Sequence, residues 1–364
     1  MTHRILFYDY TPQPNRMTGI TVYTWKILDA LLDHGQFDYV LATNRPAHMV
    51  PKSISDRVKV ISRPAPINEA KALVHNMRVV PALMRELGCA ASFHPHPTAM
   101  LLGGRRSVVV VHDLYRVTNA SLFRLRARLQ WAAVAFGLRR AGRLLAVSGA
   151  TRDALVAAYP SVADRTKVVH EASPIDVDAT TERPETDRSD RYALMVANIT
   201  PNKNVGLLFD ALKLLAADGV HPRVVLAGVD EFGTIPSLLA DAGDINLEFR
   251  GKVSDEELHR LYTGAHVYIN TSLAEGFCLP ILEAHSFGTA VICSNLPVLR
   301  EVAGDGALFI DPHDAHSLAD AIRTMFHDDD LAFALAKRAK ANVARFSWSK
   351  AAIETEALLS EVAG

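Results

Sequence analysis

The sequence predicts an α/β protein made of two doubly wound, Rossmann-like parallel-sheet domains. Short strand-like runs alternate with longer amphipathic segments along nearly the whole chain, which is typical of parallel sheets covered by helices on both faces. A polar, charged stretch at residues 176–191 interrupts this alternation, and the pattern then begins again. The length of 364 residues also favours two domains.

Residues 1–175 form the first predicted domain. Its strands are expected at residues 5–8, 39–42, 58–61, 107–111, 143–147 and 167–170, with long helices at 21–32 and 122–141. The run 108–111 consists only of valine, as expected of a strand that is buried on both faces.

Residues 192–345 form the second predicted domain, after a linker at 176–191. Its strands are expected at 192–197, 223–227, 247–250, 267–270, 290–293 and 307–310. Helices are expected at 205–218, 280–287, 296–302, 317–326 and 331–344. Ligands of such sheets bind beyond the carboxyl ends of the strands, so the informative side chains should directly follow strands.

The net charge of −1 hides two oppositely charged halves. Residues 1–175 hold 23 Lys and Arg against 11 Asp and Glu, whereas residues 176–364 hold 16 against 29. A basic half attracts anionic lipid head groups, pyrophosphates or nucleic acid, or it simply attracts the acidic half. The arginine-rich segment 116–143 suits a membrane surface or a solvated helix face. No nucleic-acid recognition motif accompanies it.

Compartment and metal content follow from what the sequence lacks. No stretch reaches the roughly 18 apolar residues of a membrane span, and the N-terminus shows no signal-peptide pattern. The three cysteines are scattered and have no zinc spacing. We therefore expect a cytoplasmic protein without a metal. The acidic run 327–330 is interpreted as a capped, solvated charge run.

The strongest motif is NTSLAEGFCLPILE at Asn270–Glu283. A strand is expected to end near Asn270, and Pro280 suits the first turn of a following helix. Glu283 would fall in that first turn, near the positive end of the helix dipole, and Glu275 on the loop before it. Each carboxylate can accept paired hydroxyl hydrogen bonds, which suits a sugar and a ribose. Alternatively, Glu283 only caps its helix and Glu275 is solvated.

This motif and the following AHSFGTAVICSNLPVLREVAGDGALFIDP closely resemble the retaining glycosyltransferases of family 4. The resemblance implies the GT-B fold, in which two Rossmann-like domains face a central cleft, and a nucleotide diphosphate sugar as donor with no further cofactor. It implies that Glu275 holds the donor sugar and Glu283 the ribose. It also assigns sugar and pyrophosphate contacts to the backbone of Gly276, Phe277 and Leu279.

The resemblance extends to other donor contacts. Lys203, in the motif VANITPNKNV, would stabilise the leaving pyrophosphate, although a lone lysine is more often solvated. Where the family usually carries an arginine, this sequence has Asn202, and Arg16 and Arg300 are candidates to replace that cation. The backbone near Val253 would contact the base. In relatives, the final segment, here 346–364, crosses back to the first domain as a helix.

Three features of the first domain are also singled out. His112, in the motif VHDL, would lie near the donor sugar; alternatively, it is a structural imidazole whose hydrogen bonds are satisfied. Gly19 precedes a helix and permits a close approach of backbone to phosphate. Residues 169–173, VHEAS, depart from the family pattern of Asn-Gly or Pro-x-Gly.

The resulting hypothesis is retaining transfer of a hexose, by Glu275, Lys203 and His112, to a glycan or polyprenyl-linked acceptor in cell-surface polysaccharide synthesis. Mannose from GDP-mannose is the expected donor, and the enzyme could sit on the inner face of the membrane. A GT-B sugar-nucleotide epimerase and a non-catalytic sugar-binding protein are the alternatives. The linkage and the oligomeric state stay open.

Overall fold

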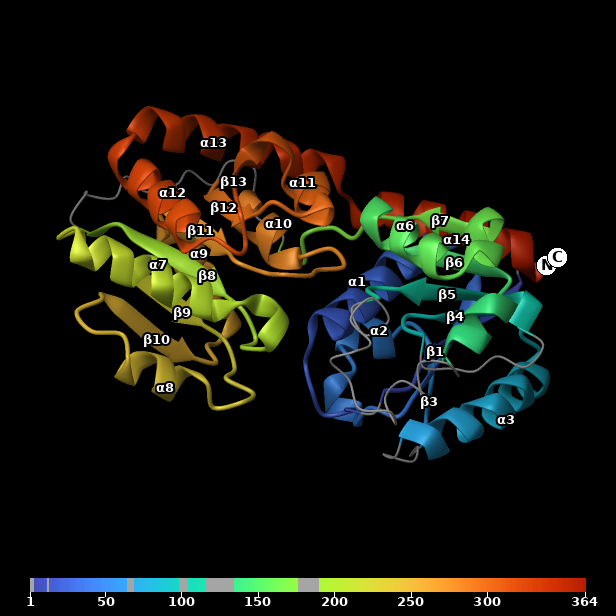
Figure 1. The fold of residues 1–364 in the computed structure, drawn as a ribbon. Coiled ribbons are helices and arrows are strands. Elements are labelled where there is room, and N and C mark those ends of the chain that lie inside the picture. Colours follow the sequence, from blue (N-terminus) through green and yellow to red (C-terminus); the bar gives the residue numbers. More distant parts are fainter. Residues whose placement is uncertain (1–2, 12, 64–68, 98–103, 115–133, 176–189) are drawn as a thin grey trace. The chain divides into compact units, whose positions relative to one another are not determined.

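The computed structural model describes residues 3–11, 13–63, 69–97, 104–114, 134–175 and 190–364. The chain forms two α/β units (Figure 1). Unit 1 comprises Met1–Pro174 together with Ser347–Gly364, and unit 2 comprises Ile175–Phe346. Most of the predicted linker, residues 176–189, and the first part of the helix predicted at 122–141 lie outside the described residues.

Unit 1 contains a seven-stranded parallel sheet in the order β3-β2-β1-β4-β5-β6-β7. The order reverses between β1 and β4, so the carboxyl ends of these two strands mark the topological switch point where open α/β sheets bind ligands. The strands are β1 (Arg4–Asp9), β2 (Asp38–Thr43), β3 (Lys59–Ser62), β4 (Ala91–His94), β5 (Ser107–Val111), β6 (Arg143–Ala146) and β7 (Thr166–Val168).

The described helices of unit 1 include one from the far end of the chain. They are α1 (Gly19–His34), α2 (Lys52–Ser55), α3 (Glu69–Leu87), α6 (Gly149–Ala158) and α14 (Trp348–Ala363). α14 packs against α1 and against β4, β5 and β6. Its fully buried Glu356 accepts a hydrogen bond from the Tyr39 hydroxyl at 3.0 Å and also pairs with His34. The helix is therefore an integral part of unit 1.

Unit 2 contains a six-stranded parallel sheet in the order β10-β9-β8-β11-β12-β13. Its order reverses between β8 and β11, which places the switch point of this unit at their carboxyl ends. The strands are β8 (Tyr192–Val196), β9 (Arg223–Ala227), β10 (Leu247–Gly251), β11 (Val267–Asn270), β12 (Ala290–Ser294) and β13 (Ala307–Ile310).

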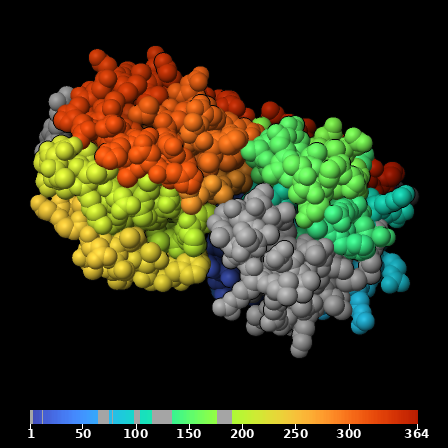
Figure 2. All heavy atoms as spheres, viewed as in Figure 1, coloured from blue at the N-terminus to red at the C-terminus, as the bar shows by residue number. Residues whose placement is uncertain are grey.

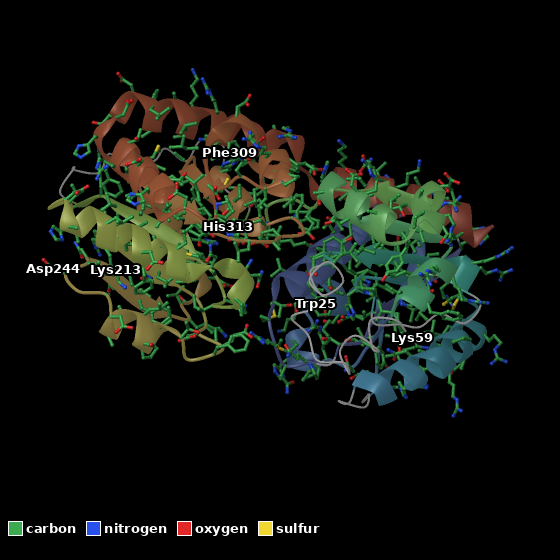
Figure 3. The ribbon with its side chains drawn as sticks, viewed as in Figure 1. Trp25, Lys59, Lys213, Asp244, Phe309 and His313 are labelled. Atoms are coloured by element: carbon green, nitrogen blue, oxygen red, sulfur yellow. The ribbon has the colours of Figure 1, made fainter. Side chains whose placement is uncertain are left out.

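Seven helices are described in unit 2, and several of them pack their buried faces against its sheet. They are α7 (Val205–Ala217), α8 (Ile235–Ala240), α9 (Asp255–Gly264), α10 (Leu279–Ser286), α11 (Pro297–Ala303), α12 (Ala315–His327) and α13 (Asp329–Asn342). Leu208, Phe209 and Leu212 of α7 pack with Leu318 and Ile322 of α12 in one apolar core. Side chains fill the space between sheet and helices (Figure 3), and α12 and α13 form the orange-red part of the face of this unit that Figure 2 shows.

Candidate functional site

Two loops meet at the switch point of unit 2, one after β8 and one after β11. Their backbones are tied together, because the Leu273 N–H donates to the Asn202 carbonyl at 2.7 Å. The Asn202 side chain donates to the Ala274 carbonyl at 3.3 Å. The Thr271 hydroxyl donates to the carbonyls of Lys203 and Asn204, at 2.8 and 3.1 Å. The two loops thus form one cross-linked platform.

The platform brings Lys203 and Glu275 together. The Lys203 ammonium donates to Glu275 Oε1 at 2.5 Å, and the Ser272 hydroxyl donates to the same oxygen at 2.7 Å. The Glu275 side chain is 9% exposed and that of Lys203 is 22% exposed. Both groups are therefore held in place while still reaching solvent. The sequence predicted both residues, and the structure places them in direct contact.

Backbone strain marks the same two loops. Asn204 and Cys278 have positive φ angles of 50° and 83°, and within the described residues no other non-glycine residue does. Each is the residue that precedes a helix, α7 and α10 respectively. Strained conformations of this kind cluster at functional sites. At the start of α10, Pro280 has no N–H, and the Ile281 N–H donates to the Cys278 carbonyl at 3.1 Å, so an anion here would be attracted by the Leu279 N–H and by the positive end of the helix dipole.

The prediction that Glu283 lies in the first turn of its helix is wrong. The left-handed turn at Cys278 starts α10 at Leu279, which makes Glu283 the fifth helical residue rather than a capping residue. Its half-buried carboxylate accepts a hydrogen bond from the Tyr262 hydroxyl at 2.7 Å. Burial raises the pKa of Glu283 to about 7, although the Tyr262 hydrogen bond opposes that rise.

We expect the Glu283→Gln variant to become more stable than the wild type as the pH rises through 7. The folded protein holds an extra proton on Glu283 between pH 4.5, its ordinary pKa, and about 7. The free energy of unfolding therefore falls over this range in the wild type, by about 3 kcal/mol at one pKa unit per 1.4 kcal/mol. The glutamine side chain keeps an oxygen that can accept the hydrogen bond from Tyr262, but it does not titrate. Urea unfolding of both proteins at pH 5 and 8 measures the difference, and parallel pH profiles would contradict it.

The remaining predicted donor contacts of unit 2 lie on two loops, one after β11 and one after β10. Gly276 is half-buried between Glu275 and the buried Phe277, whose ring meets Phe346 edge-on at 5.7 Å. Leu279 is the first residue of α10. Val253 lies in the connection between β10 and α9. The aromatic side chain of Phe277 thus anchors the loop in the core, while its backbone stays beside Glu275.

The two cations proposed to replace the family arginine are engaged elsewhere. Arg300, on α11, donates to the Asn295 side chain and stacks on the Phe309 ring at 4.4 Å. Arg16, in unit 1, donates to Gln13 Oε1 at 3.3 Å. Gly19, the exposed first residue of α1, also belongs to unit 1.

His112 directly follows β5 and uses both ring nitrogens within unit 1. Nδ1 lies 2.9 Å from Glu171 Oε1, and Nε2 lies 2.8 Å from the Pro95 carbonyl. Burial lowers the pKa of His112, but the hydrogen bond and charge of Glu171 outweigh it, so the pKa is raised. Glu171, the unexplained departure in VHEAS, is thus the partner of this histidine. A hydrogen bond from His112 to a sugar would require one of these contacts to break.

A second charged cluster at the switch point of unit 1 was missed. Asp9 ends β1, fully buried, and accepts hydrogen bonds from Arg45 Nε at 2.7 Å and Thr43 Oγ1 at 3.2 Å. His96 Nε2 lies 3.3 Å from its other oxygen. Burial would raise the pKa of Asp9, but His96 and Arg45 outweigh it and lower that pKa. His96 lies in the sequence FHPHP at residues 93–97, and only the fold reveals its partner.

Two features are absent from the described residues. No described helix is long and apolar enough to cross a membrane. No group of three or more His, Cys, Asp or Glu side chains could hold a metal ion within the described part of the chain.

Known proteins share this organisation. Residues 17–176 match the family model described as Glycosyltransferase Family 4, and residues 176–342 match Glycosyl transferases group 1. O-antigen chain mannosyltransferase B of Escherichia coli is 33% identical over 45% of this chain, but that match spans only 44% of the relative. O-antigen chain mannosyltransferase RfbU of Salmonella typhimurium is 24% identical over 85% of this chain and 87% of its own.

A solved structure shares the fold over almost the whole chain. The Anabaena protein HepE, in complex with UDP-glucose, superposes with a TM-score of 0.74 at 19% identity, covering 98% of this chain and 99% of its own. The predicted fold class, two Rossmann-like parallel-sheet domains of the GT-B type, is confirmed. With family models matching both of its halves, the chain belongs to glycosyltransferase family 4.

Proposed function

We propose that this protein transfers a hexose from a nucleotide diphosphate sugar to a hydroxyl acceptor with retention of configuration. The contact between Lys203 and Glu275 at the switch point of unit 2 carries the proposal. Side chains at this edge of a doubly wound sheet face bound ligands. An ammonium and a carboxylate here match the two ends of such a donor, the pyrophosphate and the sugar hydroxyls.

Lys203 would act on the leaving group. Its ammonium stabilises the negative charge that develops on the pyrophosphate as the glycosidic bond breaks. The Leu279 N–H and the positive end of the α10 dipole would act on the same anion. The Lys203 ammonium and the start of α10 would together stabilise the charge of the leaving pyrophosphate, so the proposed reaction uses no metal ion.

Glu275 would orient the sugar. Lys203 and Ser272 both bind Oε1, and within the described residues no side chain is hydrogen-bonded to Oε2, which can accept sugar hydroxyl groups. A carboxylate tied to an ammonium and a hydroxyl is a weak nucleophile, so a double displacement is disfavoured. We propose attack from the face of the departing phosphate, which takes the acceptor's proton, with positioning as the main catalytic effect.

Mannose is the proposed sugar, from GDP-mannose, because two relatives bear the name O-antigen chain mannosyltransferase. That HepE binds UDP-glucose supports a nucleotide diphosphate hexose in the same fold. The proposed acceptor is a glycan or a polyprenyl-linked saccharide in cell-surface polysaccharide synthesis. We place the reaction in the cytoplasm, at the inner face of the membrane.

A thermal-shift screen of nucleotide sugars, followed by product analysis, tests the function. GDP-mannose at 100 times its dissociation constant is expected to stabilise the protein by about 2.7 kcal/mol. Free mannose should have no such effect. Mass spectrometry should then detect a hexose added to a saccharide acceptor, and NMR should show that the anomeric configuration is kept.

Other outcomes of that screen identify the alternatives. Conversion of the donor sugar without any acceptor would indicate an epimerase. Stabilisation by free mannose without turnover would indicate a sugar-binding protein. Stronger stabilisation by UDP-glucose than by GDP-mannose would overturn GDP-mannose as the donor, but it would not contradict the proposed transfer of a hexose.

A further inference from the structure

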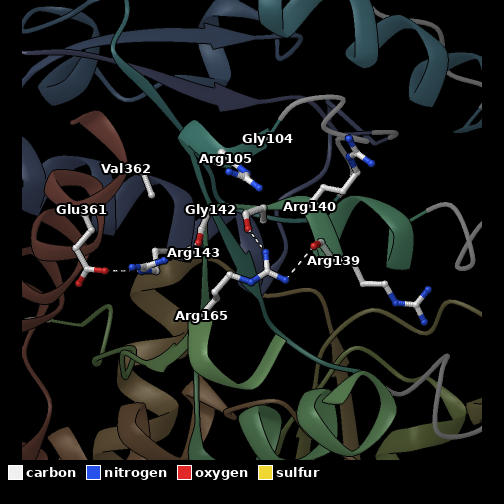
Figure 4. A pocket seen from close by; sticks show the side chains of 10 residues that line it. Gly104, Arg105, Arg139, Arg140, Gly142, Arg143, Arg165, Glu361 and Val362 are labelled. Carbon is white, nitrogen blue, oxygen red and sulfur yellow. Dashed lines mark hydrogen bonds and ion pairs between the residues drawn. The ribbon is translucent and has the colours of Figure 1, made fainter. Parts of the chain in front are cut away.

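Unit 1 contains a cavity of about 660 Å³ at the amino-terminal ends of β5 and β6 (Figure 4). Its walls are the turn Gly104–Arg106, residues 139–143, Arg165 and the end of α14. His112 follows the opposite, carboxyl end of β5. The cavity therefore lies at the other edge of the sheet from the predicted sugar contact, and nothing in the proposed transfer reaction uses it.

Arginine dominates the cavity. Five arginines line it against one carboxylate, that of Glu361, which pairs with Arg143. Arg165 donates to the carbonyls of Ala141 and Arg139, at 2.5 and 2.9 Å (dashed in Figure 4). Its positive charge thus meets neutral backbone oxygens instead of an acid. After Glu361 and Arg143 are paired, a strong positive charge is left in the cavity.

The other three arginines have no carboxylate partner among the described residues. Arg105, Arg139 and Arg140 are exposed. Arg139 stacks on the Tyr159 ring at 4.9 Å, and Arg140 lies over the Phe136 ring at 5.2 Å. Residues 104–143 of the sequence contain nine arginines and only one acidic residue. Charges of one sign that are gathered in a cavity raise the local concentration of counter-ions of the other sign.

The wall that carries these arginines is held by backbone contacts. The Gly142 N–H donates to the Gly104 carbonyl at 2.8 Å, and a Cβ atom on Gly142 would meet the Arg105 carbonyl oxygen at 2.1 Å. Only glycine permits this close approach between the two segments. These contacts hold the backbone of Arg105 beside the start of β6. Arg139 and Arg140 lie in the chain segment that leads into the same strand.

We propose that this cavity binds the phosphate groups of an anionic ligand, a pyrophosphate or the phosphate of a lipid head group. Guanidinium groups bind phosphate oxygens in pairs through a planar fork of N–H donors. The volume lies within the roughly 300–1,000 Å³ of small-molecule sites. The site does not share a residue with the Lys203–Glu275 platform, so it stands independently of the proposed function.

Calorimetric titration with inorganic pyrophosphate tests the site. The double variant Arg139→Gln/Arg140→Gln should bind about 100-fold more weakly than the wild type, since each of the two lost hydrogen bonds to a charged group contributes about a factor of ten. Both side chains are exposed, so the fold should survive, and Arg105→Gln provides a second, separate variant. Arg78→Gln, at an exposed arginine of α3 outside the cavity, is the matched control.

Pyrophosphate could also bind near Lys203, so the titration is repeated in Lys203→Gln. Binding that persists in Lys203→Gln and is lost in the cavity variants supports the proposal, whatever happens to transfer activity. Equal binding by wild type and both cavity variants would overturn it, and so would an equal loss in Arg78→Gln.

Vesicle sedimentation separates the two sources of phosphate. Vesicles of phosphatidylcholine with and without phosphatidylglycerol are incubated with the wild type and with the same variants. Loss of phosphatidylglycerol-dependent binding in the cavity variants alone would identify a lipid head group as the ligand. Pyrophosphate binding that depends on the cavity, with vesicle binding unchanged, would identify a soluble ligand. Independence of both assays from the cavity arginines would refute the site.

Discussion

The Glu275→Ala variant is expected to lose about 10²–10³-fold in kcat/KM for glycosyl transfer. Preorganised polar groups at a reacting centre typically contribute effects of this size. The substitution also leaves the Lys203 ammonium without the carboxylate that it contacts at 2.5 Å, so the cation is free to shift away from the leaving phosphate. Steady-state kinetics with the donor found in the thermal-shift screen measures the loss.

Two further variants separate charge from shape at this position. Glu275→Gln keeps an oxygen for the Ser272 hydroxyl and removes only the charge, so it should be nearly as inactive if the ion pair matters. Glu256→Gln, at an 84% exposed carboxylate on α9, is the matched control and should keep wild-type activity. Near-normal turnover by Glu275→Ala in a protein with an unchanged melting temperature would refute the assignment of Glu275.

The Asp9→Ala variant is expected to destabilise unit 1 by about 3–5 kcal/mol, the usual cost of removing one partner from a buried ion pair. Arg45 is only 3% exposed at its side chain, and it would keep its charge without a carboxylate. His96 would lose the same partner. Urea unfolding followed by circular dichroism should show a lower midpoint with a similar slope.

An exposed aspartate in the same unit provides the control for Asp9. Asp33 pairs with Arg57 at 2.7 Å, but its side chain is 71% exposed. Exposed pairs contribute about 0–1 kcal/mol, so Asp33→Ala should change the midpoint little. If Asp9→Ala and Asp33→Ala had equal, small effects, the buried cluster would not hold the switch point of unit 1 together.

Local patterns were enough to predict much of the fold, such as β5 from the all-valine run. The resemblance to family 4 pointed to Lys203 and Glu275, two residues that the structure joins. The sequence did not predict β4, although all four of its residues are buried. The reason is that Ser92 and His94 are polar, and that the Ser92 hydroxyl lies 2.9 Å from His94 Nε2 inside the unit. A hydrophobicity pattern cannot detect a strand whose polar residues pair internally.

Contacts between distant segments explain what the sequence could not predict. Asp9 ends β1, whereas Arg45 and His96 follow β2 and β4, and only the sheet order brings the three together. Glu171 is 59 positions from His112, so its role as a partner could not be inferred from its neighbours. The position of Glu283 depended on one backbone angle at Cys278, for which residue type gives no warning, because a positive φ usually belongs to glycine.

The place of α14 in unit 1 has a consequence for how the chain folds during synthesis. The side chains of His34 and Tyr39, which contact Glu356, must wait until α14 has left the ribosome. Unit 2 is continuous in the chain from Ile175 to Phe346, so all of its residues are available earlier. The unit encoded second is therefore able to finish folding first, and the nascent unit 1 exposes its surface for α14 until that helix emerges.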